Sequence, residues 1–257
     1  MSPSNRAVIV DLHPGNLAAE DIVCLRGDKN LEGISSKKSW LKDRLVEGLK
    51  FKVLKVNGRS WGMIEYLPGE NAWRPVEAAG YTFINCLWII GRYKNHGFGR
   101  KLLAQCADDS KGRNGLAVVT SSKPFLAGKE FFLKNGFEVC DSAPPYFELL
   151  VKRLKKNVPL PKFRDKAKKL LGPERAGLTF FFSDQCPYCA PSLKEMAAIA
   201  KKRRIPFQLV KIKNKKDAQN LPLAYGTFGI FFDGQFLTHQ PFYGKAFDRL
   251  LSSPQKS

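Results

Sequence analysis

The feature that most constrains the fold is a long apolar stretch that runs into a glycine-containing loop. Residues 81–90 read YTFINCLWII, and the loop after them carries Gly97 and Gly99 one residue apart. A nearly continuous apolar run of this length is typical of a strand in the middle of a sheet, covered on both faces. From residue 99 to 109, apolar side chains recur on one face at helical spacing. The sequence therefore predicts a central strand, a tight loop and a helix.

Other segments extend this pattern into an α+β fold. Asn57-Gly58 separates two short apolar runs and predicts a type I′ hairpin. In this first part the predicted strands cover residues 7–11, 51–56, 60–66, 81–90, 115–121, 138–140 and 147–152. The predicted helices cover residues 36–48, 99–109 and 126–135. Because antiparallel strands come first and strands then alternate with helices, we expect one mixed sheet with helices on both faces.

The chain divides where its composition changes. Residues 152–169 hold nine basic residues and one acid, with Pro159 and Pro161 among them. This pattern predicts a connector with one short basic helix. We therefore expect a first domain over residues 1–155, a connector over 156–176 and a second domain over 177–257.

The net charge is strongly positive. The 257 residues include 43 Lys and Arg against 23 Asp and Glu, a formal charge of +20. Such an excess attracts polyanions, including nucleic acid, acidic lipid and phosphorylated small molecules. Phe163 is the one aromatic residue in the basic run, so we expect no specific nucleic-acid binding. The six cysteines are scattered, and we find no signal peptide and no apolar run long enough to span a membrane. We therefore expect a cytoplasmic protein without a membrane partner.

The glycine loop has two interpretations. It is an ordinary strand-to-helix turn, or it binds an anion. A helix that begins at Gly99 leaves its first N–H groups free, at the positive end of the helix dipole. Gly97 and Gly99 remove side chains from this space, and Lys94 and Arg100 add positive charge. Neither the Walker pattern nor the Rossmann glycine fingerprint is present.

Two motifs carry a resemblance to a known family. Residues 94–99, KNHGFG, and residues 130–137, EFFLKNGF, are similar to the pyrophosphate loop and the later signature of the GNAT acetyltransferases. The resemblance covers about residues 5–155. It implies that acetyl-CoA is the cosubstrate and that an amine, on a small molecule or a protein, is the acceptor. It implies cofactor contacts through the following residues: Trp88, Ile89, Ile90, Lys94, Asn95, His96, Gly97, Phe98, Gly99 and Arg100.

The resemblance leaves the acid and the base open. Phe132 stands where many family members carry a tyrosine that protonates the departing thiolate, and a phenyl ring cannot donate a proton. Glu65, Glu70 and Glu77 lie near the expected acceptor cleft; each is a base candidate or a solvated surface acid. Cys86, on the central strand, faces the acceptor or is a small buried residue. We select Cys86 and Glu77 as the catalytic candidates.

The second part of the chain carries a CPYC motif. Predicted strands cover residues 178–183, 206–212, 228–232 and 235–238, and predicted helices follow the CPYC motif and cover residues 244–251. The order βαβ–ββα with Cys186 and Cys189 at the first helix start resembles the thioredoxin fold, and the tetrapeptide is the one that glutaredoxins use. A helix start stabilises a thiolate, so we expect an acidic, exposed Cys186 and a deeper Cys189 that can form a disulfide with it.

Two other interpretations of the CPYC motif stay open. A zinc site needs about four ligands, and only Cys140 and His239 are available besides the pair, so we expect no metal. A purely docking module is the other interpretation. Phe228 supports it, because it stands where the thioredoxin fold places a cis-proline that shapes the substrate groove.

Taken with residues 62–69 and 73–77, GMIEYLPG and WRPVE, the two parts resemble the YoaP-like branch, in which a GNAT domain precedes a small thioredoxin-like domain. The predicted function is acetyl-CoA-dependent N-acetyl transfer to an unidentified acceptor. The first alternative is a thiol–disulfide oxidoreductase with a CoA-sensing GNAT module. A basic nucleic-acid-binding protein is the third.

Overall fold

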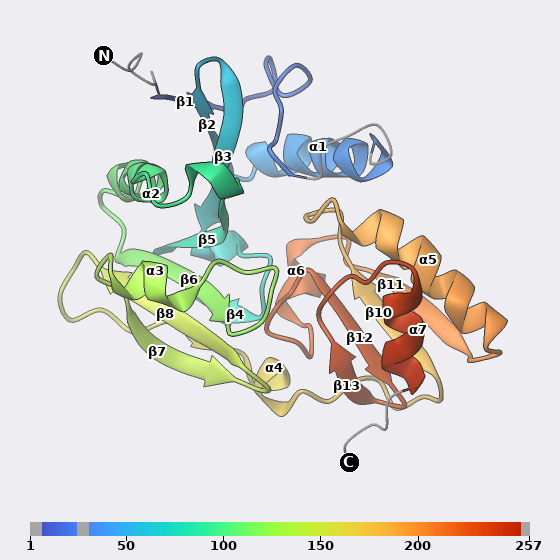
Figure 1. The fold of residues 1–257 in the computed structure, drawn as a ribbon. Coiled ribbons are helices and arrows are strands. Elements are labelled where there is room, and N and C mark those ends of the chain that lie inside the picture. Colours follow the sequence, from blue (N-terminus) through green and yellow to red (C-terminus); the bar gives the residue numbers. More distant parts are fainter. Residues whose placement is uncertain (1–6, 25–30, 253–257) are drawn as a thin grey trace.

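The computed structural model describes residues 7–24 and 31–252, which form two larger sheets, one two-stranded sheet and the helices packed on them (Figure 1). The first part contains β1 Ala7–Asp11, α1 Leu31–Leu45, β2 Lys50–Val56, β3 Arg59–Pro68, η2 Gly69–Asn71, β4 Val76–Glu77, β5 Tyr81–Ile89, η3 Gly91–Tyr93, α2 Phe98–Asp109, β6 Gly115–Ser121, α3 Lys129–Leu133, β7 Glu138–Ala143 and β8 Phe147–Arg153. The remainder contains β9 Lys162–Phe163, α4 Asp165–Lys169, β10 Leu178–Phe182, α5 Cys189–Lys202, β11 Phe207–Lys211, α6 Lys215–Gln219, β12 Phe228–Phe232, β13 Gln235–Thr238 and α7 Lys245–Ser252.

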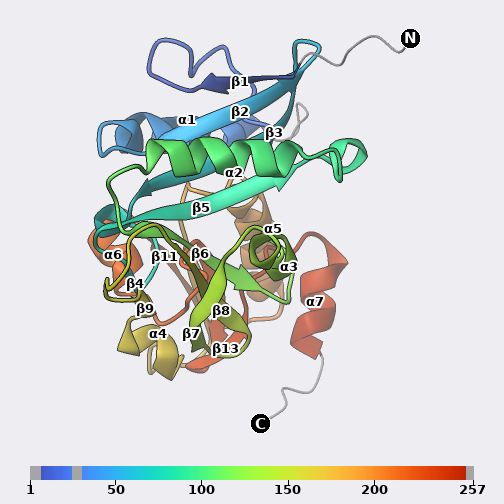
Figure 2. The ribbon, with the colours of Figure 1, turned by 90° about the vertical axis from the view of Figure 1, so that its left-hand side faces the viewer.

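The first sheet is mixed, as predicted. Its seven strands run in the order β1-β2-β3-β5-β6-β8-β7, and only the β5–β6 pair is parallel. Phe51 and Val53 belong to the same apolar cluster as Trp40 of α1. Ile64 belongs instead to the cluster of Leu102 in α2. Helices therefore cover both faces, and α2 lies along the face shown in Figure 2.

The sheet opens between its two parallel strands. β5 pairs with β6 only from Tyr81 to Ile84. Beyond that point β5 continues to Ile89 along β3, while β6 continues along β8. Over residues 85–89, the edge of β5 that faces β6 therefore has no neighbouring strand among the described residues. This opening creates space for a ligand beside unpaired backbone.

The second sheet has four strands in the order β11-β10-β12-β13. The β10–β11 pair is parallel, and the other two pairs are antiparallel. A tight turn joins β12 to β13, with Asp233 at φ 47° and Gly234 at φ 76°. These are the left-handed values that a type I′ turn requires, so a hairpin joins the strands predicted over residues 228–232 and 235–238.

The two sheets share one apolar core. Trp40 of α1 and Phe51 of β2 join Phe180 and Leu193 of the second part in a single cluster of buried residues. Helix α1 contacts α5, and both lie on the same side of the first sheet (Figure 1). The second part therefore packs against the first over a continuous apolar surface.

The segment between the parts is anchored at several points. Its short strand β9 pairs with β4, and Phe163 is only 1% exposed. Lys168 of α4 forms an ion pair with Asp141 of β7 at 2.8 Å. The predicted short basic helix is therefore present, and the segment packs against the first sheet. The domain boundaries themselves stay a prediction.

Two helices differ from the predicted ranges in ways that matter for the site. Helix α1 occupies residues 31–45 instead of 36–48, and the chain turns at Gly48 with φ 87°. Helix α3 is confined to residues 129–133, because Gly128 before it is extended at φ −67° and ψ 137°. Residues 122–128 are therefore a loop, which faces the opening in the sheet.

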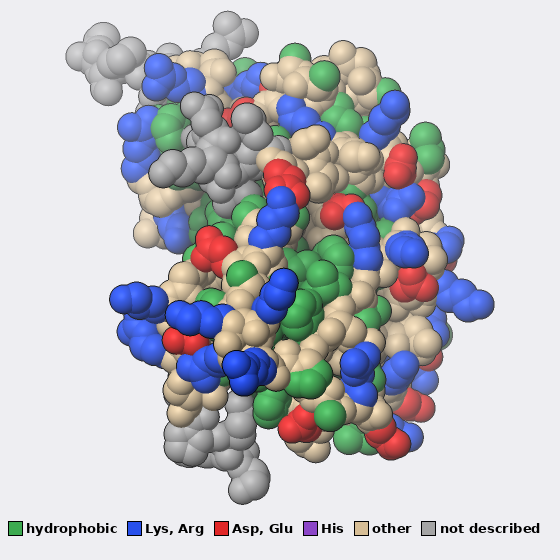
Figure 3. Space-filling model, turned by 90° about the vertical axis from the view of Figure 1, so that its right-hand side faces the viewer, with side chains coloured by type: hydrophobic (Ala, Val, Ile, Leu, Met, Phe, Trp, Pro, Cys, Tyr) green, Lys and Arg blue, Asp and Glu red, His purple; other side chains and the backbone are tan. Residues whose placement is uncertain are grey.

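Charged side chains are distributed widely. Figure 3 shows Lys and Arg over the right-hand face of the molecule, with Asp and Glu among them and an apolar area between. In residues 7–24 and 31–252, no helix is long and apolar enough to cross a bilayer.

Candidate functional site

A cavity of about 520 Å³ lies where β5 ends and α2 begins. Its lining includes eight of the ten residues predicted to contact the cofactor: Trp88, Ile89, Lys94, Asn95, Gly97, Phe98, Gly99 and Arg100. The other two do not line it. The N–H of Ile90 donates to the Trp61 carbonyl at 2.8 Å, and His96 donates from Nδ1 to the Lys94 carbonyl at 2.8 Å.

The glycine loop presents free backbone N–H groups. Helix α2 begins at Phe98, and the preceding Gly97 has φ 76° with no side chain capping the helix. The first helical bond runs from the Lys101 N–H to the Gly97 carbonyl at 3.1 Å. The N–H groups of residues 98–100 therefore lack helical partners and carry the positive end of the dipole. This geometry suits a phosphate group.

The two glycines serve different purposes. At Gly97, a Cβ would meet nothing within 4 Å, so the backbone conformation and not space demands glycine there. At Gly99, a Cβ would lie 3.1 Å from the Phe131 ring. Glycine at that position therefore allows close packing of α2 against the segment that forms the opposite wall.

That opposite wall was missed by the sequence reasoning. Phe131, Lys134 and Asn135 line the same cavity. Their spacing of three and four residues places them on one helical face, which was the available signal. Phe132, the position considered for a missing acid, is fully buried between Phe131 and Phe137 and lines neither this cavity nor the next one.

A second cavity, of about 290 Å³, adjoins the first. The two share the wall residues Leu87, Trp88, Leu126 and Ala127. Its remaining lining comes from both parts of the chain: Cys24, Lys37, Met63, Glu65, Arg74, Asn85, Cys86, Pro124, Phe125, Gln185, Cys186, Pro187, Tyr188, Tyr225 and Thr227. A ligand in the first cavity can therefore meet a ligand in the second at the end of β5.

A buried polar network surrounds Glu65 in the second cavity. Glu65 is 1% exposed and forms an ion pair with Lys37 of α1, which is 2% exposed. Its other oxygen accepts hydrogen bonds from Asn85 Nδ2 at 2.9 Å and from Gln185 Nε2 at 3.0 Å. Asn85 Oδ1 is buried and has no partner among the described residues. Both oxygens of the Glu65 carboxylate have partners, whereas Asn85 Oδ1 beside it remains free, within the described part of the chain, to accept a hydrogen bond.

Arg74 ties this network to the second part of the chain. Its guanidinium donates to Gln185 Oε1 at 2.9 Å and to Thr227 Oγ1 at 2.6 Å. Burial lowers the pKa of Arg74 from its usual value, and the ring of Tyr225 lies 5.4 Å away. The WRPVE segment therefore supplies a buried cation that joins the two sheets.

The structure separates the acidic candidates. Of the three, only Glu65 reaches the second cavity. Glu70 accepts from the Gly80 N–H and pairs with Arg113, and Glu77 is half exposed beside Lys162 at 3.2 Å. Neither of them lines either cavity, so Glu77 is not brought to the acceptor space as we had expected.

Cys86 does line the second cavity, opposite Glu65 in the β3–β5 register. Burial is the main cause that raises the pKa of Cys86 to about 12, and the nearby Glu65 carboxylate adds to it. Cys24 lines the same cavity, and burial also raises the pKa of its thiol. Both thiols are therefore protonated at neutral pH, and neither is a ready base or nucleophile.

Cys186 enters the same cavity from the second part of the chain. Helix α5 begins at Cys189, so Cys186 lies in the turn before it. Cys186 is half-buried and not exposed as predicted, because it faces the first part of the chain across the cavity, whereas Cys189 is deeper and 1% exposed. A hydrogen bond from the Cys189 thiol lowers the pKa of Cys186, aided by the Tyr188 N–H and by the charges of Lys37 and Arg74, against the effect of burial. Burial is the main cause that raises the pKa of Cys189, and the hydrogen bond with Cys186 adds to it.

The loop over residues 122–128 is held by His239. The ring donates from Nε2 to the Pro124 carbonyl at 3.0 Å and accepts at Nδ1 from the Tyr146 hydroxyl at 2.8 Å. Burial lowers the pKa of His239 to about 4, which keeps the ring neutral. Phe125 of the same loop contacts Tyr188 edge to face.

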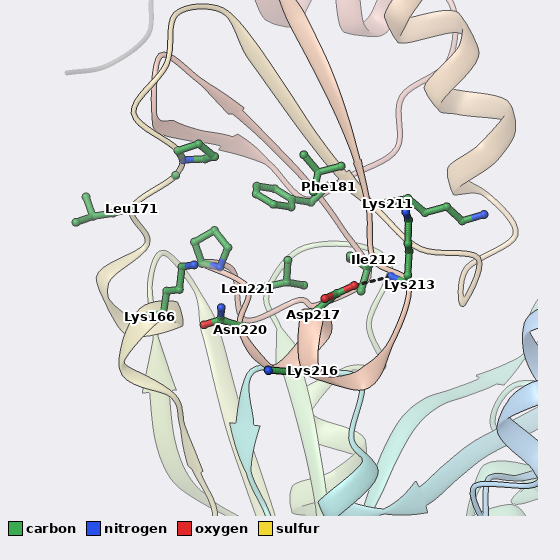
Figure 4. Close-up of a pocket in the computed structure, with 14 residues that line it drawn as sticks. Lys166, Leu171, Phe181, Lys211, Ile212, Lys213, Lys216, Asp217, Asn220 and Leu221 are labelled. Atoms are coloured by element: carbon green, nitrogen blue, oxygen red, sulfur yellow. Dashed lines mark hydrogen bonds between the residues drawn. The ribbon is translucent and has the colours of Figure 1, made fainter.

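A larger cavity, of about 720 Å³, lies away from this site on the second part of the chain (Figure 4). Lys166, Lys211, Lys213 and Lys216 line it around Phe181 and other apolar side chains. Its carboxylate, Asp217, already accepts from the Lys213 N–H at 3.0 Å. The residues that line this cavity include no cysteine or other nucleophile of comparable reactivity, so the adjoining pair of cavities is the candidate site.

Comparisons with known proteins match both parts of the chain. Residues 21–137 match the Acetyltransferase (GNAT) family and residues 206–249 match the YoaP-like family. The "Uncharacterized N-acetyltransferase YoaP" of Bacillus subtilis is 34% identical over 249 residues, which cover 95% of this chain and 98% of that protein.

Solved structures are similar to part of the chain. PaiA N-acetyltransferase from Thermoplasma acidophilum, in complex with coenzyme A, is 19% identical over 58% of this chain and 99% of that one, with a TM-score of 0.44. An acetyltransferase from Thermus thermophilus is 17% identical over 58% of this chain and 97% of that one, with a TM-score of 0.46.

Proposed function

This chain belongs to the GNAT acetyltransferase family, and we propose that acetyl-CoA occupies the 520 Å³ cavity while an acceptor amine occupies the 290 Å³ cavity. The protein is an acetyl-CoA-dependent N-acetyltransferase. The observation that carries the proposed arrangement is the wall that the two cavities share, at Leu87, Trp88, Leu126 and Ala127. Transfer requires the thioester carbon and the amine to meet, and only adjoining cavities allow this.

Backbone groups hold most of the donor in this proposal. The N–H groups of residues 95–100 bind the pyrophosphate, and the unpaired edge of β5 over residues 87–89 bonds the pantetheine arm. Lys94, Arg100 and Lys134 add positive charge around the phosphates. Because these three charges are partly exposed, water and salt screen them, and the amides supply the larger share of the binding.

The Glu65 network prepares the acceptor amine. The amine must lose a proton to attack the thioester carbon, and Glu65 is the carboxylate that lines the acceptor cavity. Lys37, Asn85 and Gln185 fix its orientation. Backbone N–H groups of β5 polarise the thioester carbonyl. Neither Phe131 nor Phe132 can protonate the departing thiolate, so that proton comes from water. Cys86 shapes the cavity wall next to the amine.

The second part of the chain is, in this proposal, a thioredoxin-like domain that also completes the acceptor cavity. Its strand order with one parallel pair, and the position of Cys186 and Cys189 around the start of α5, support that assignment. The hydrogen bond from Cys189 that favours the Cys186 thiolate supports a redox role. Phe228 is buried at the start of β12, where the thioredoxin fold places a cis-proline.

A lowered Cys186 pKa also favours the alternative function, a thiol–disulfide oxidoreductase with a CoA-sensing module. One set of assays separates the two. The purified full-length protein is titrated calorimetrically with acetyl-CoA, then incubated with acetyl-CoA and a panel of small amines, and in parallel with insulin and dithiothreitol. We expect acetyl-CoA binding, acetylation of at least one amine and slow insulin reduction. Binding without any acetylation, together with rapid insulin reduction, would support the alternative.

A further inference from the structure

The acceptor cavity contains sulfur chemistry that acetyl transfer to an amine does not require. Cys24, Cys86 and Cys186 all line it. Burial keeps the first two thiols protonated, whereas Cys186 is stabilised as a thiolate by its neighbour Cys189. One wall of the cavity therefore carries a nucleophilic sulfur with a second thiol directly behind it, as in a pair that exchanges disulfides.

Another residue that lines the cavity offers an acceptor for an N–H group. Asn85 is 4% exposed, and its Nδ2 donates to Glu65 at 2.9 Å. Because a carboxylate only accepts hydrogen bonds, this contact fixes the amide orientation and leaves Oδ1 without a partner among the described residues. An unmatched buried carbonyl is destabilising, and a ligand amine relieves this by donating a hydrogen bond to it.

The cavity holds both features within a small volume. At about 290 Å³ it lies at the lower end of the range for small-molecule sites. Residues from both parts of the chain enclose it, including Gln185 and Tyr225 of the second part. A ligand that places its amine at Asn85 therefore places its other end near Cys186 after only a few bonds. These dimensions favour a compact molecule over a protein side chain.

We propose that the acceptor is a small aminothiol, which enters as its disulfide and is held on Cys186 as a mixed disulfide while its amine is acetylated. This proposal rests on the proposed acetyl transfer. The Cys186 thiolate attacks one sulfur of the disulfide, a new S–S bond forms to one half, and the other half leaves as a thiolate. The tethered amine then loses a proton and forms a C–N bond to the acetyl carbon, while the C–S bond of acetyl-CoA breaks and CoA leaves as a thiolate.

Cys189 releases the product. It attacks the Cys186 sulfur, passes its proton to the departing sulfur, and leaves a Cys186–Cys189 disulfide beside the free N-acetylated thiol. Reduction of that disulfide takes two electrons from a small dithiol. The pair therefore serves to capture and release the substrate, and the proposal explains why the CPYC motif faces the acetylation site.

Cystamine tests this proposal in the full-length protein. The Cys189→Ser variant cannot release the adduct, so it is incubated with cystamine, freed of excess reagent, treated with acetyl-CoA and analysed by intact mass and peptide mapping. We expect one cysteamine group on Cys186, followed by one acetyl group on that cysteamine. Dithiothreitol should then release N-acetylcysteamine. The control variant Cys186→Ser should carry neither group. Cys140→Ser changes a half-buried cysteine that lines neither cavity, and it should behave as the protein without that change.

The outcomes separate the two proposals. An adduct on Cys86 or Cys24, or an adduct on Cys186 that stays unacetylated while acetyl-CoA is bound, overturns the aminothiol proposal. Hexane diamine, in which carbon replaces both sulfurs of cystamine, is the matched amine. The aminothiol proposal is also overturned if two results come together: the unsubstituted protein and Cys186→Ser acetylate hexane diamine equally well, and both acetylate it faster than cystamine. In that case the proposed acetyl transfer to an amine still stands. Failure to bind acetyl-CoA at all would overturn the proposed function itself.

Discussion

The buried Lys37–Glu65 pair allows a quantitative test of the acceptor cavity. Both side chains are at most 2% exposed, so each charge depends on the other for compensation. Lys37→Met leaves the carboxylate of Glu65 buried without a counter-ion, and Glu65→Gln leaves the ammonium group in the same state. Removing one partner of a buried pair costs about 3–5 kcal/mol, so we expect each single variant to lose about that much unfolding free energy.

The double variant Lys37→Met/Glu65→Gln should be more stable than either single variant. It removes both charges, and glutamine keeps a carbonyl oxygen for the amide donors of Asn85 and Gln185. Since replacing a whole buried pair by neutral groups is often close to neutral, the two losses should not add.

Urea unfolding of the four proteins, followed by tryptophan fluorescence, gives the coupling free energy. We expect the double variant to recover at least about 2 kcal/mol relative to the less stable single variant. It should bind acetyl-CoA normally but acetylate amines slowly, because it lacks the carboxylate. If the single variants are as stable as the unsubstituted protein, or if the two losses of unfolding free energy simply add, Lys37 and Glu65 do not form a buried ion pair. Normal acetylation by the double variant would refute the role of Glu65.

Four further expectations concern the glycine loop that binds the cofactor, the His239 ring that holds residues 122–128, the thiols of Cys186 and Cys189, and the net positive charge. Gly97→Ala should weaken acetyl-CoA binding in calorimetry and cost about 1 kcal/mol of stability, because φ is 76° there; Lys94→Ala should weaken binding less. Because the pKa of His239 falls to about 4 on folding, its neutral form contributes about 3 kcal/mol above pH 6.5. That contribution should disappear as the pH falls from about 6.5 to 4, and pH-dependent unfolding of His239→Gln should lack this loss. Iodoacetamide near neutral pH should label Cys186 before Cys189, and equal rates would exclude an activated thiol. DNA binding should be weak, independent of sequence and abolished by raised salt, and retention at physiological salt would contradict this.

Local patterns predicted most of the first sheet and the cofactor loop. The apolar run up to Ile89 reads as a central strand because burial on both faces leaves little room for polar residues. Asn57-Gly58 has φ 50° and 78°, so the predicted hairpin is confirmed. Such features depend on neighbouring residues in the chain, and a single sequence therefore contains them.

The acceptor cavity depends on contacts that local patterns do not contain. Glu65 looks like one polar residue in an apolar strand, and its burial relies on Lys37 from a helix and on Gln185, 120 residues later. The buried Arg74 donates to Gln185 and Thr227, which lie in the other part of the chain. Sequence reasoning selected Glu77 instead of Glu65, since nothing in the sequence pairs Glu77 with Lys162. The acceptor cavity could not be predicted because a single sequence does not show which polar groups pair over long distances in the chain.

A crystal structure of the protein with bound CoA tests the central claim most directly. The account predicts the pyrophosphate on the N–H groups of residues 95–100, the pantetheine along the free edge of β5, and the CoA sulfur at the wall shared by the two cavities, facing Asn85. Density for CoA in another place, or a CoA sulfur that points away from the cavity lined by Glu65 and Cys186, would contradict it.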